Sequence, residues 1–425
     1  WYAQAGTPEV NIDESWDANR ATLTLTLSQK TPPTPKQAIK KPVPIPLRVA
    51  LLDGKGGHLG ADGWDNGETV LVLDEDEKTF EISLDAGSPK PLLSINRQFS
   101  APVRLKRDLS TEELLTLASA ETDPFNTWDS FQTLSKTEIF RLLDNPQSPP
   151  DEEFVGALAD AVRENEDDPA FAALLTALPD IGELFQEREP VDPAGLNDAR
   201  KRVRKALAEA LAADAERILS KPTPVPFAPS AAQAGIRALR TAMIGLTGAL
   251  GTQEAASNLK SLFDAAPNMT EKLACLRALV PIEGDIRDAA IDAFYEQWKD
   301  NPLVIDKWFA VQAGQGTAAD ARRLSKHEDF DLSNPNRVRS VAASFAMTNL
   351  AAFHARDGAG HEIVGEIIAE ADKRNPALAA RLLTSFEQWK KLEPVARESA
   401  KQTLEALRDS GLSKNAMDIV ARALE

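Results

Sequence analysis

Two histidine–glutamate pairs are the residues of this chain whose types and spacing come nearest to a catalytic metal site. They are His327-Glu328 and His361-Glu362. In the motif His-Glu-x-x-His, two histidines one helical turn apart bind zinc from the same helix face, and the glutamate activates a water molecule. Asp331 follows the first pair where the second histidine belongs, and Gly365 follows the second pair. Neither pair can therefore complete this zinc site.

The other residues that could do chemistry are few. The chain has 4 His and 1 Cys. Cys275 lies among apolar residues, which is typical of a buried thiol, and a lone cysteine fits a reducing compartment, so we expect a cytoplasmic protein. The sequence also lacks a Gly-x-Ser-x-Gly elbow, a Walker loop and a dinucleotide fingerprint. We therefore expect no metal ligands and no catalytic residues in this chain.

The charge of the chain and the length of its apolar runs argue against two classes of partner. Its net charge is -17, whereas a protein that binds a phosphate backbone needs clustered lysines and arginines. The densest basic run, residues 200–205, precedes the apolar segment 206–211, a pattern that predicts the solvated face of a helix. No apolar run approaches the roughly 20 residues of a membrane span. We expect neither nucleic acid nor a membrane as a partner.

The first 108 residues have the pattern of β-structure. Leucines alternate with hydroxyl residues over 21–29, which places the apolar side chains on one face of a strand. The same alternation over 43–51 includes Pro44 and Pro46, which cannot donate hydrogen bonds, so this strand should lie at an edge or begin outside the sheet. Turn residues separate further short runs at 69–73, 79–82 and 102–105. We predict a small all-β sandwich over residues 1–108.

From Ser110 onward the pattern becomes helical. Ser110 and Glu113 have the spacing of a capping box, in which each side chain bonds the backbone amide of the other residue. Short amphipathic segments, separated by prolines, then continue to the end of the chain. Such helices must stack to bury their apolar faces, and no strict repeat is present. We predict an all-α superhelical domain, with irregular helical repeats, over residues 109–425.

Passages along nearly the whole chain carry a resemblance to a known family. They are WYAQAGTP (1–8) with LSQKTPPTP (27–35), DPFNTWD (123–129), LVIDKWFAVQA (303–313), and SNPNRVRS (333–340) with NLAAFH (349–354) and RNP (374–376). In this order they resemble bacterial-type aminopeptidase N, a gluzincin family of zinc metallopeptidases. The resemblance implies the β-sandwich and C-terminal superhelix of such an enzyme. The catalytic domain is then absent from this chain, which agrees with a sequence that starts at Trp1 instead of Met.

The resemblance also implies where the chemistry of the intact enzyme resides. The family binds zinc through His-Glu-x-x-His and a distal glutamate, and it holds the free amino group of the substrate with a Gly-x-Met-Glu-Asn loop. Neither motif occurs in this sequence. We therefore expect an inactive C-terminal portion of a zinc-dependent aminopeptidase. Its partners would be the missing N-terminal and catalytic domains of the same polypeptide and a peptide substrate, in an enzyme that is a monomer when intact.

Two arginines follow from the resemblance as substrate-binding candidates. In the family the superhelix closes over the catalytic domain and restricts peptide access, and Arg339 and Arg381 lie within the matching passages. A planar guanidinium can donate two parallel hydrogen bonds to the carboxylate at the far end of a peptide. The alternative for both residues is pairing with acidic neighbours.

The alternative for the chain is a stand-alone helical-repeat scaffold that binds protein partners on a concave face.

Overall fold

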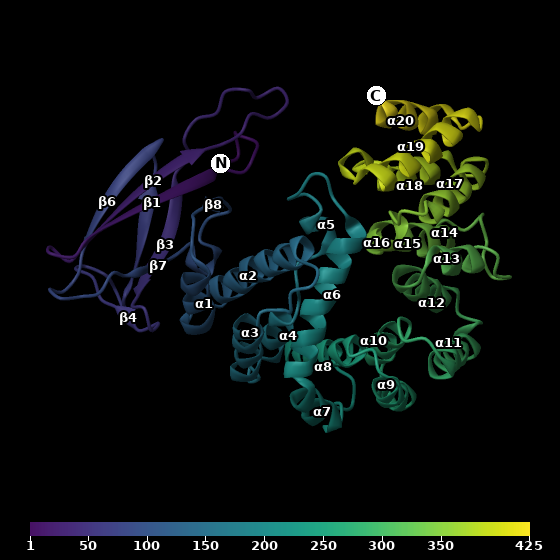
Figure 1. The fold of residues 1–425 in the computed structure, drawn as a ribbon, viewed down its shortest axis with the longest axis horizontal. Helices are drawn as coiled ribbons and strands as arrows, with labels where there is room; N and C mark the ends of the chain where they lie inside the picture. Colours follow the sequence, from purple (N-terminus) through teal and green to yellow (C-terminus); the bar gives the residue numbers. More distant parts are fainter. The chain divides into compact units, whose positions relative to one another are not determined.

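The computed structural model describes residues 1–425 and divides into two compact units. The first unit comprises residues 1–137 with 156–161, and the second comprises 138–155 with 162–425. Figure 1 traces the strands of the first unit and the helices that follow them along the chain. Each unit is described by itself.

The first unit contains two four-stranded sheets that share one core. One sheet has the order β6-β2-β1-β8, and in the other β3 pairs with β4, β5 and β7. Inward-facing leucines such as Leu25 pack in the same cluster as Leu47 of the second sheet, and both are fully buried. The predicted β-sandwich is therefore confirmed. The strands are β1 (Glu9–Asp17), β2 (Thr22–Lys30), β3 (Ile45–Leu52), β4 (His58–Leu59), β5 (Glu68–Leu73), β6 (Glu77–Ser83), β7 (Leu92–Ile95) and β8 (Arg104–Lys106).

The predicted strand over 43–51 corresponds to β3, which has neighbours on both sides only over its second half. It begins at Ile45, after Pro44, which agrees with the expected start outside the sheet. Pro46 is paired with Val72 of β5, but β7 joins β3 only from Val49 onward. The first half of β3 thus has a single neighbour. A proline is tolerated there because its missing N–H faces the unpaired side.

Helices occupy the chain from residue 111 to its end, as predicted. Ser110 caps the first helix, and both hydrogen bonds of the capping box with Glu113 are formed. The α-helices before residue 250 are α1 (Thr111–Ala120), α2 (Pro124–Asp144), α3 (Glu152–Glu164), α4 (Pro169–Leu175), α5 (Ile181–Leu184), α6 (Pro193–Ala210), α7 (Ala212–Ser220) and α8 (Ala231–Ala249).

The remaining α-helices are α9 (Gln253–Ala265), α10 (Met269–Leu279), α11 (Asp285–Trp298), α12 (Pro302–Gln315), α13 (Ala318–Leu324), α14 (Pro335–Val338), α15 (Ser344–Thr348), α16 (Leu350–Phe353), α17 (Ala359–Asp372), α18 (Pro376–Leu383), α19 (Pro394–Asp409) and α20 (Lys414–Leu424). The shorter turns are η1 (Arg97–Phe99), the π-helical η2 (Arg339–Ala343), η3 (Thr384–Phe386) and η4 (Trp389–Lys391).

Stacking between helices close in sequence builds the second unit. Helix α8 packs on α10 and α4, α10 packs on α9, and α18 packs on α17 and α20. Neighbours along the chain therefore bury one another's apolar faces, which is the logic of helical-repeat proteins. No helix combines the length and apolar character needed to cross a membrane.

Candidate functional site

A groove beside α12 contains Arg339, one of the two predicted site residues. Its volume is about 730 Å³, and it lies between α12 and the helical segment that runs through α14, η2 and α15. Leu303 and Met347 line it and are exposed large apolar side chains. Lys307 and Arg339 supply positive charge. The groove therefore combines an apolar surface with cationic groups.

The local sequence explains how Arg339 reaches this groove. The side chain of Asn334 caps α14 by accepting hydrogen bonds from the amides of Asn336 and Arg337, and Pro335 sets the first turn. The chain then widens into the π-helical turn η2, where the amide of Ser344 donates to the carbonyl of Arg339. Single π-helical turns are frequent at functional sites. Arg339 is the first residue of this turn.

The charges around the groove leave Arg339 without an anionic partner. Asp306, an acidic lining residue, accepts a 2.7 Å hydrogen bond from Nε of the buried Arg337. Nη2 of Arg339 instead donates to the side-chain oxygen of Asn336, and neither Arg339 nor Lys307 forms an ion pair. In a chain of net charge -17, these two cations remain free to attract an anion.

The structure treats the two predicted arginines differently. Arg339 lines the groove, whereas Arg381 is exposed on α18 and is not among the lining residues. Met347 borders both the groove and a neighbouring cavity of about 180 Å³. Thr384, which follows α18, lines that cavity. Substrate binding by either arginine stays a prediction.

A buried pair of histidines borders this smaller cavity. His354 is 3% exposed and lines it, while His361 is 0% exposed. His354 Nδ1 lies 2.8 Å from His361 Nε2, and His361 Nδ1 lies 3.0 Å from Ser399 Oγ. Burial lowers the pKa of His354 to about 3 and that of His361 to about 4, so both rings are neutral near pH 7. Sequence spacing alone gave no sign of this pair.

The residues of this chain do not fit the zinc ion that the resemblance implies for the intact enzyme. No group of three or more His, Cys, Asp or Glu side chains could hold a metal ion. His327 packs against the rings of Tyr295 and Trp308, outside any ligand set. Cys275 is buried, and burial raises the pKa of its thiol to about 12, which makes it a poor nucleophile at neutral pH.

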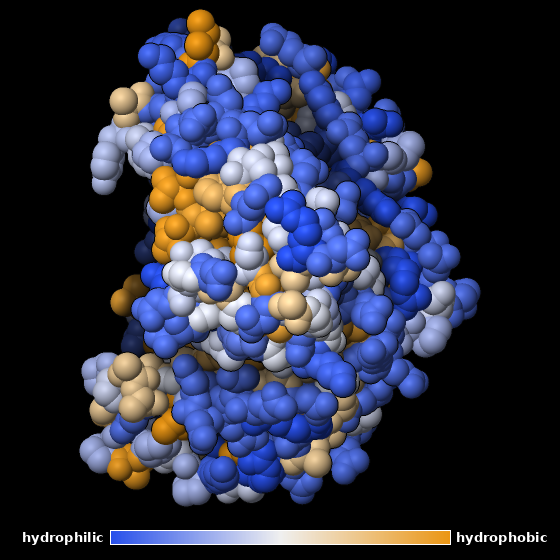
Figure 2. Space-filling view, turned by 90° about the vertical axis from the view of Figure 1, so that its left-hand side faces the viewer, coloured by the Kyte–Doolittle hydropathy of each residue, from blue (hydrophilic) through white to orange (hydrophobic).

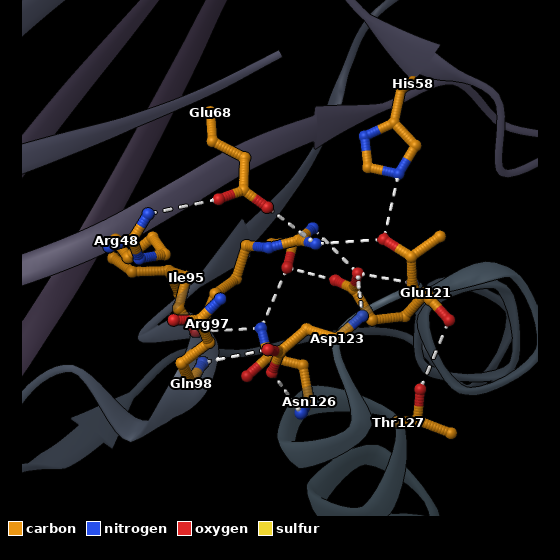
Figure 3. Close-up of polar contacts among 12 residues, drawn as sticks. Arg48, His58, Glu68, Ile95, Arg97, Gln98, Glu121, Asp123, Asn126 and Thr127 are labelled. Carbon is orange, nitrogen blue, oxygen red and sulfur yellow. Dashed lines mark hydrogen bonds and ion pairs between the residues drawn. The ribbon is translucent and has the colours of Figure 1, made fainter. Parts of the chain in front are cut away.

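A second polar cluster lies in the first unit, and Figure 3 shows its contacts. Arg97 is 3% exposed, and its Nη2 lies 2.9 Å from Glu68 Oε1. Nη1 lies 2.7 Å from Glu121 Oε1, close enough for an ion pair, but the geometry is not that of a hydrogen bond. Asn126 donates to Ser94 Oγ and to the carbonyl of Ile95. The cluster thus ties the end of β7 to the α1–α2 junction.

Comparisons with known proteins extend over the whole chain. Residues 111–425 match a family described as "Domain of unknown function (DUF3458_C) ARM repeats", and residues 6–108 match "Domain of unknown function (DUF3458) Ig-like fold". Aminopeptidase N of Caulobacter vibrioides is 38% identical over 432 residues, covering 100% of this chain and 49% of the relative. Aminopeptidase N of Escherichia coli is 32% identical over 433 residues, covering 100% of this chain and 50% of the relative.

A solved structure agrees with these relatives. The crystal structure of Legionella pneumophila aminopeptidase A in complex with aspartic acid superposes with a TM-score of 0.81 at 26% identity. The match covers 99% of this chain and 49% of that chain. This chain therefore spans about half the length of the relatives it matches.

Proposed function

Because this chain belongs to the aminopeptidase N family, as a C-terminal part of such a protein, we propose that it completes a zinc-dependent enzyme that removes N-terminal residues from peptides. In this proposal the chain supplies no catalytic group. Its helices wall the active-site cavity and restrict the peptides that can enter. An enclosed site would exclude water and folded proteins, and it would orient a threaded peptide.

The groove at Arg339 is the observation that supports this role. A peptide bound by its N-terminus at a catalytic centre carries a free carboxylate at its other end. Arg339 and Lys307 offer positive charge without an ion-pair partner, beside the apolar surface of Leu303 and Met347. We propose that Arg339 binds the carboxylate of the peptide, and that Arg381 contributes from α18.

Turnover of matched peptides by the whole aminopeptidase polypeptide tests this proposal. Arg339→Ala should lower kcat/KM for peptides with a free C-terminal carboxylate by about 10-fold or more, because a hydrogen bond to a charged group contributes roughly 1.5–3 kcal/mol. The same peptides with an amidated C-terminus, and an aminoacyl anilide, should be hydrolysed almost as before. Arg381→Ala should act in the same direction.

Arg322→Ala on α13 is the matched control, because this half-buried arginine already pairs with Glu366 at 2.7 Å. It should leave the preference for free carboxylates unchanged. An equal loss of activity on carboxylate, amide and anilide substrates in Arg339→Ala would contradict the proposed role. Such a result would leave Arg339 as a residue that only supports the fold.

A further inference from the structure

Arg204 is a cation that the folded chain leaves without a partner. It lies on α6, and no hydrogen bond or ion pair joins its guanidinium to another residue. The run 200–205 was expected to be solvated, yet Arg204 is partly buried, and burial lowers its pKa to about 10. That expectation is wrong for Arg204, because α6 turns this residue toward its helical neighbours. A poorly solvated charge without a counter-ion is costly to keep.

The surrounding helix leaves room for this guanidinium. A Cβ atom at Gly245 of α8 would lie 2.7 Å from Nη2 of Arg204. Gly245 is not among the residues with positive φ, so its backbone conformation does not require glycine. The missing side chain therefore matters as space in which the Arg204 side chain rests against α8.

Two more groups beside this position are suited to an anion. Arg200 lies one turn before Arg204 on the same face of α6. It donates to the carbonyl oxygens of Pro179 at 2.8 Å and Leu178 at 3.3 Å, and it forms no ion pair. Thr241 lies one turn before Gly245 on α8, and its buried hydroxyl has no hydrogen-bond partner.

We propose that Arg204, supported by Arg200 and Thr241, forms an anion site between α6 and α8 that binds a carboxylate or phosphate group. A guanidinium donates two parallel hydrogen bonds to either oxyanion, and a hydroxyl can add a third. None of these residues lines the groove at Arg339. The inference therefore does not depend on the proposed peptidase role.

Thermal unfolding of the full chain at constant ionic strength tests the site. The probes are inorganic phosphate, and N-acetylglycine compared with its neutral amide, with chloride as the reference anion. An anion that binds only the folded state raises Tm as its concentration increases. Phosphate, N-acetylglycine or both should raise Tm by a few degrees, and the neutral amide should not. Phosphate alone would indicate a phosphate ligand, and N-acetylglycine alone a carboxylate ligand.

Three variants separate a binding role from a structural one. Arg204→Met should abolish the anion-dependent rise while leaving Tm without anion unchanged or higher, because it removes an unpaired charge. Gly245→Ala keeps the charge but displaces the guanidinium, so it should reduce the rise. Lys205→Met removes an exposed charge from the same helix, and this variant should retain the anion-dependent rise in Tm.

Two results would overturn the site: no response of the unmodified chain to either anion, or an equal response in Arg204→Met. If Arg204→Met does not fold, Gly245→Ala takes its place as the test. An undiminished anion-dependent rise in Tm in Gly245→Ala would then also overturn the proposal.

Discussion

The hydrogen bond between His354 and His361 joins two buried rings that are both neutral near pH 7. Their pKa values in the folded chain, about 3 and about 4, lie below the ordinary value of 6.5. Below about pH 6.5 the unfolded chain therefore binds protons that the folded chain does not. The contribution of the pair to stability is complete above this pH and is lost progressively as the pH falls, toward about 4 for His361 and about 3 for His354.

We expect the free energy of unfolding to decrease by up to about 1.4 kcal/mol per pH unit for each histidine across this window. Urea denaturation of the chain between pH 7 and pH 5 measures the decrease. His361→Gln removes one titrating group and should make the pH dependence shallower. An unchanged slope in this variant would show that other groups cause the acid sensitivity.

Single residues also show what the sequence could and could not reveal. A linear motif placed Arg339 among candidate residues, and the structure puts it in a groove. The histidine pair was missed because the His354–His361 contact depends on how the loop after α16 returns to α17. Arg204 was misjudged because a basic run does not show which of its members a neighbouring helix covers.

At the scale of elements, the cluster around Arg97 fixes η1 to the α1–α2 junction. Asn96 and Gln98 have φ of 62° and 57°, a left-handed conformation that costs of order 1–3 kcal/mol per residue. The side chain of Asn96 accepts a 2.9 Å hydrogen bond from the amide of Ala101, and Asp123 accepts one of 3.0 Å from the amide of Gln98. These contacts hold the strained turn in place.

Arg97→Met should destabilise the chain by about 3–5 kcal/mol, because the side chain of Glu121 is 0% exposed and would remain as an unpaired charge. Arg48→Met is the control. Arg48 pairs with the same Glu68, but its side chain is 37% exposed, so the loss should stay below about 1 kcal/mol. Chemical denaturation measures both, and similar losses would argue against the burial explanation.

The order of elements was largely predictable from the sequence. Alternation identified β2 and β3, turn residues separated the runs of β5, β6 and β8, and the capping box located the start of α1. Strand β7 was missed because all four of its residues are buried, so it shows no alternation. The π-helical turn η2 was also missed, since hydrophobic spacing over five residues cannot distinguish it from an α-helical turn.

At the scale of the whole molecule, one face is mostly polar. Hydrophilic colours prevail on the face drawn in Figure 2, where hydrophobic residues gather in limited areas. The exposed large apolar residues are distributed from Trp1 at the start to Val395 on α19. An aminopeptidase half and a free-standing scaffold therefore need to be distinguished by activity as well as by surface.

We expect the chain alone to carry no stoichiometric zinc and to hydrolyse no aminoacyl anilide, because its side chains form no metal-binding group. Metal analysis and an anilide assay, with and without added zinc, check this expectation. Metal-dependent turnover that persists after removal of contaminating peptidases would place catalytic residues in this chain. Activity that appears only in the longer polypeptide would agree with the proposal that this chain supplies no catalytic group.

The π-helical turn at Arg339 gives the groove a tolerance to the number of residues that a regular α-helical turn lacks. Each residue of an α-helix advances the chain by about 100° around the axis, so a residue inserted into regular α geometry rotates everything that follows it. A π-helical turn closes its hydrogen bond one residue later and so holds the extra residue within the turn. Loss of one residue within η2 would therefore let the helix continue in regular α geometry with Arg339 on nearly the same side relative to α15. Related chains that lack this turn could thus keep a cationic groove although they are one residue shorter.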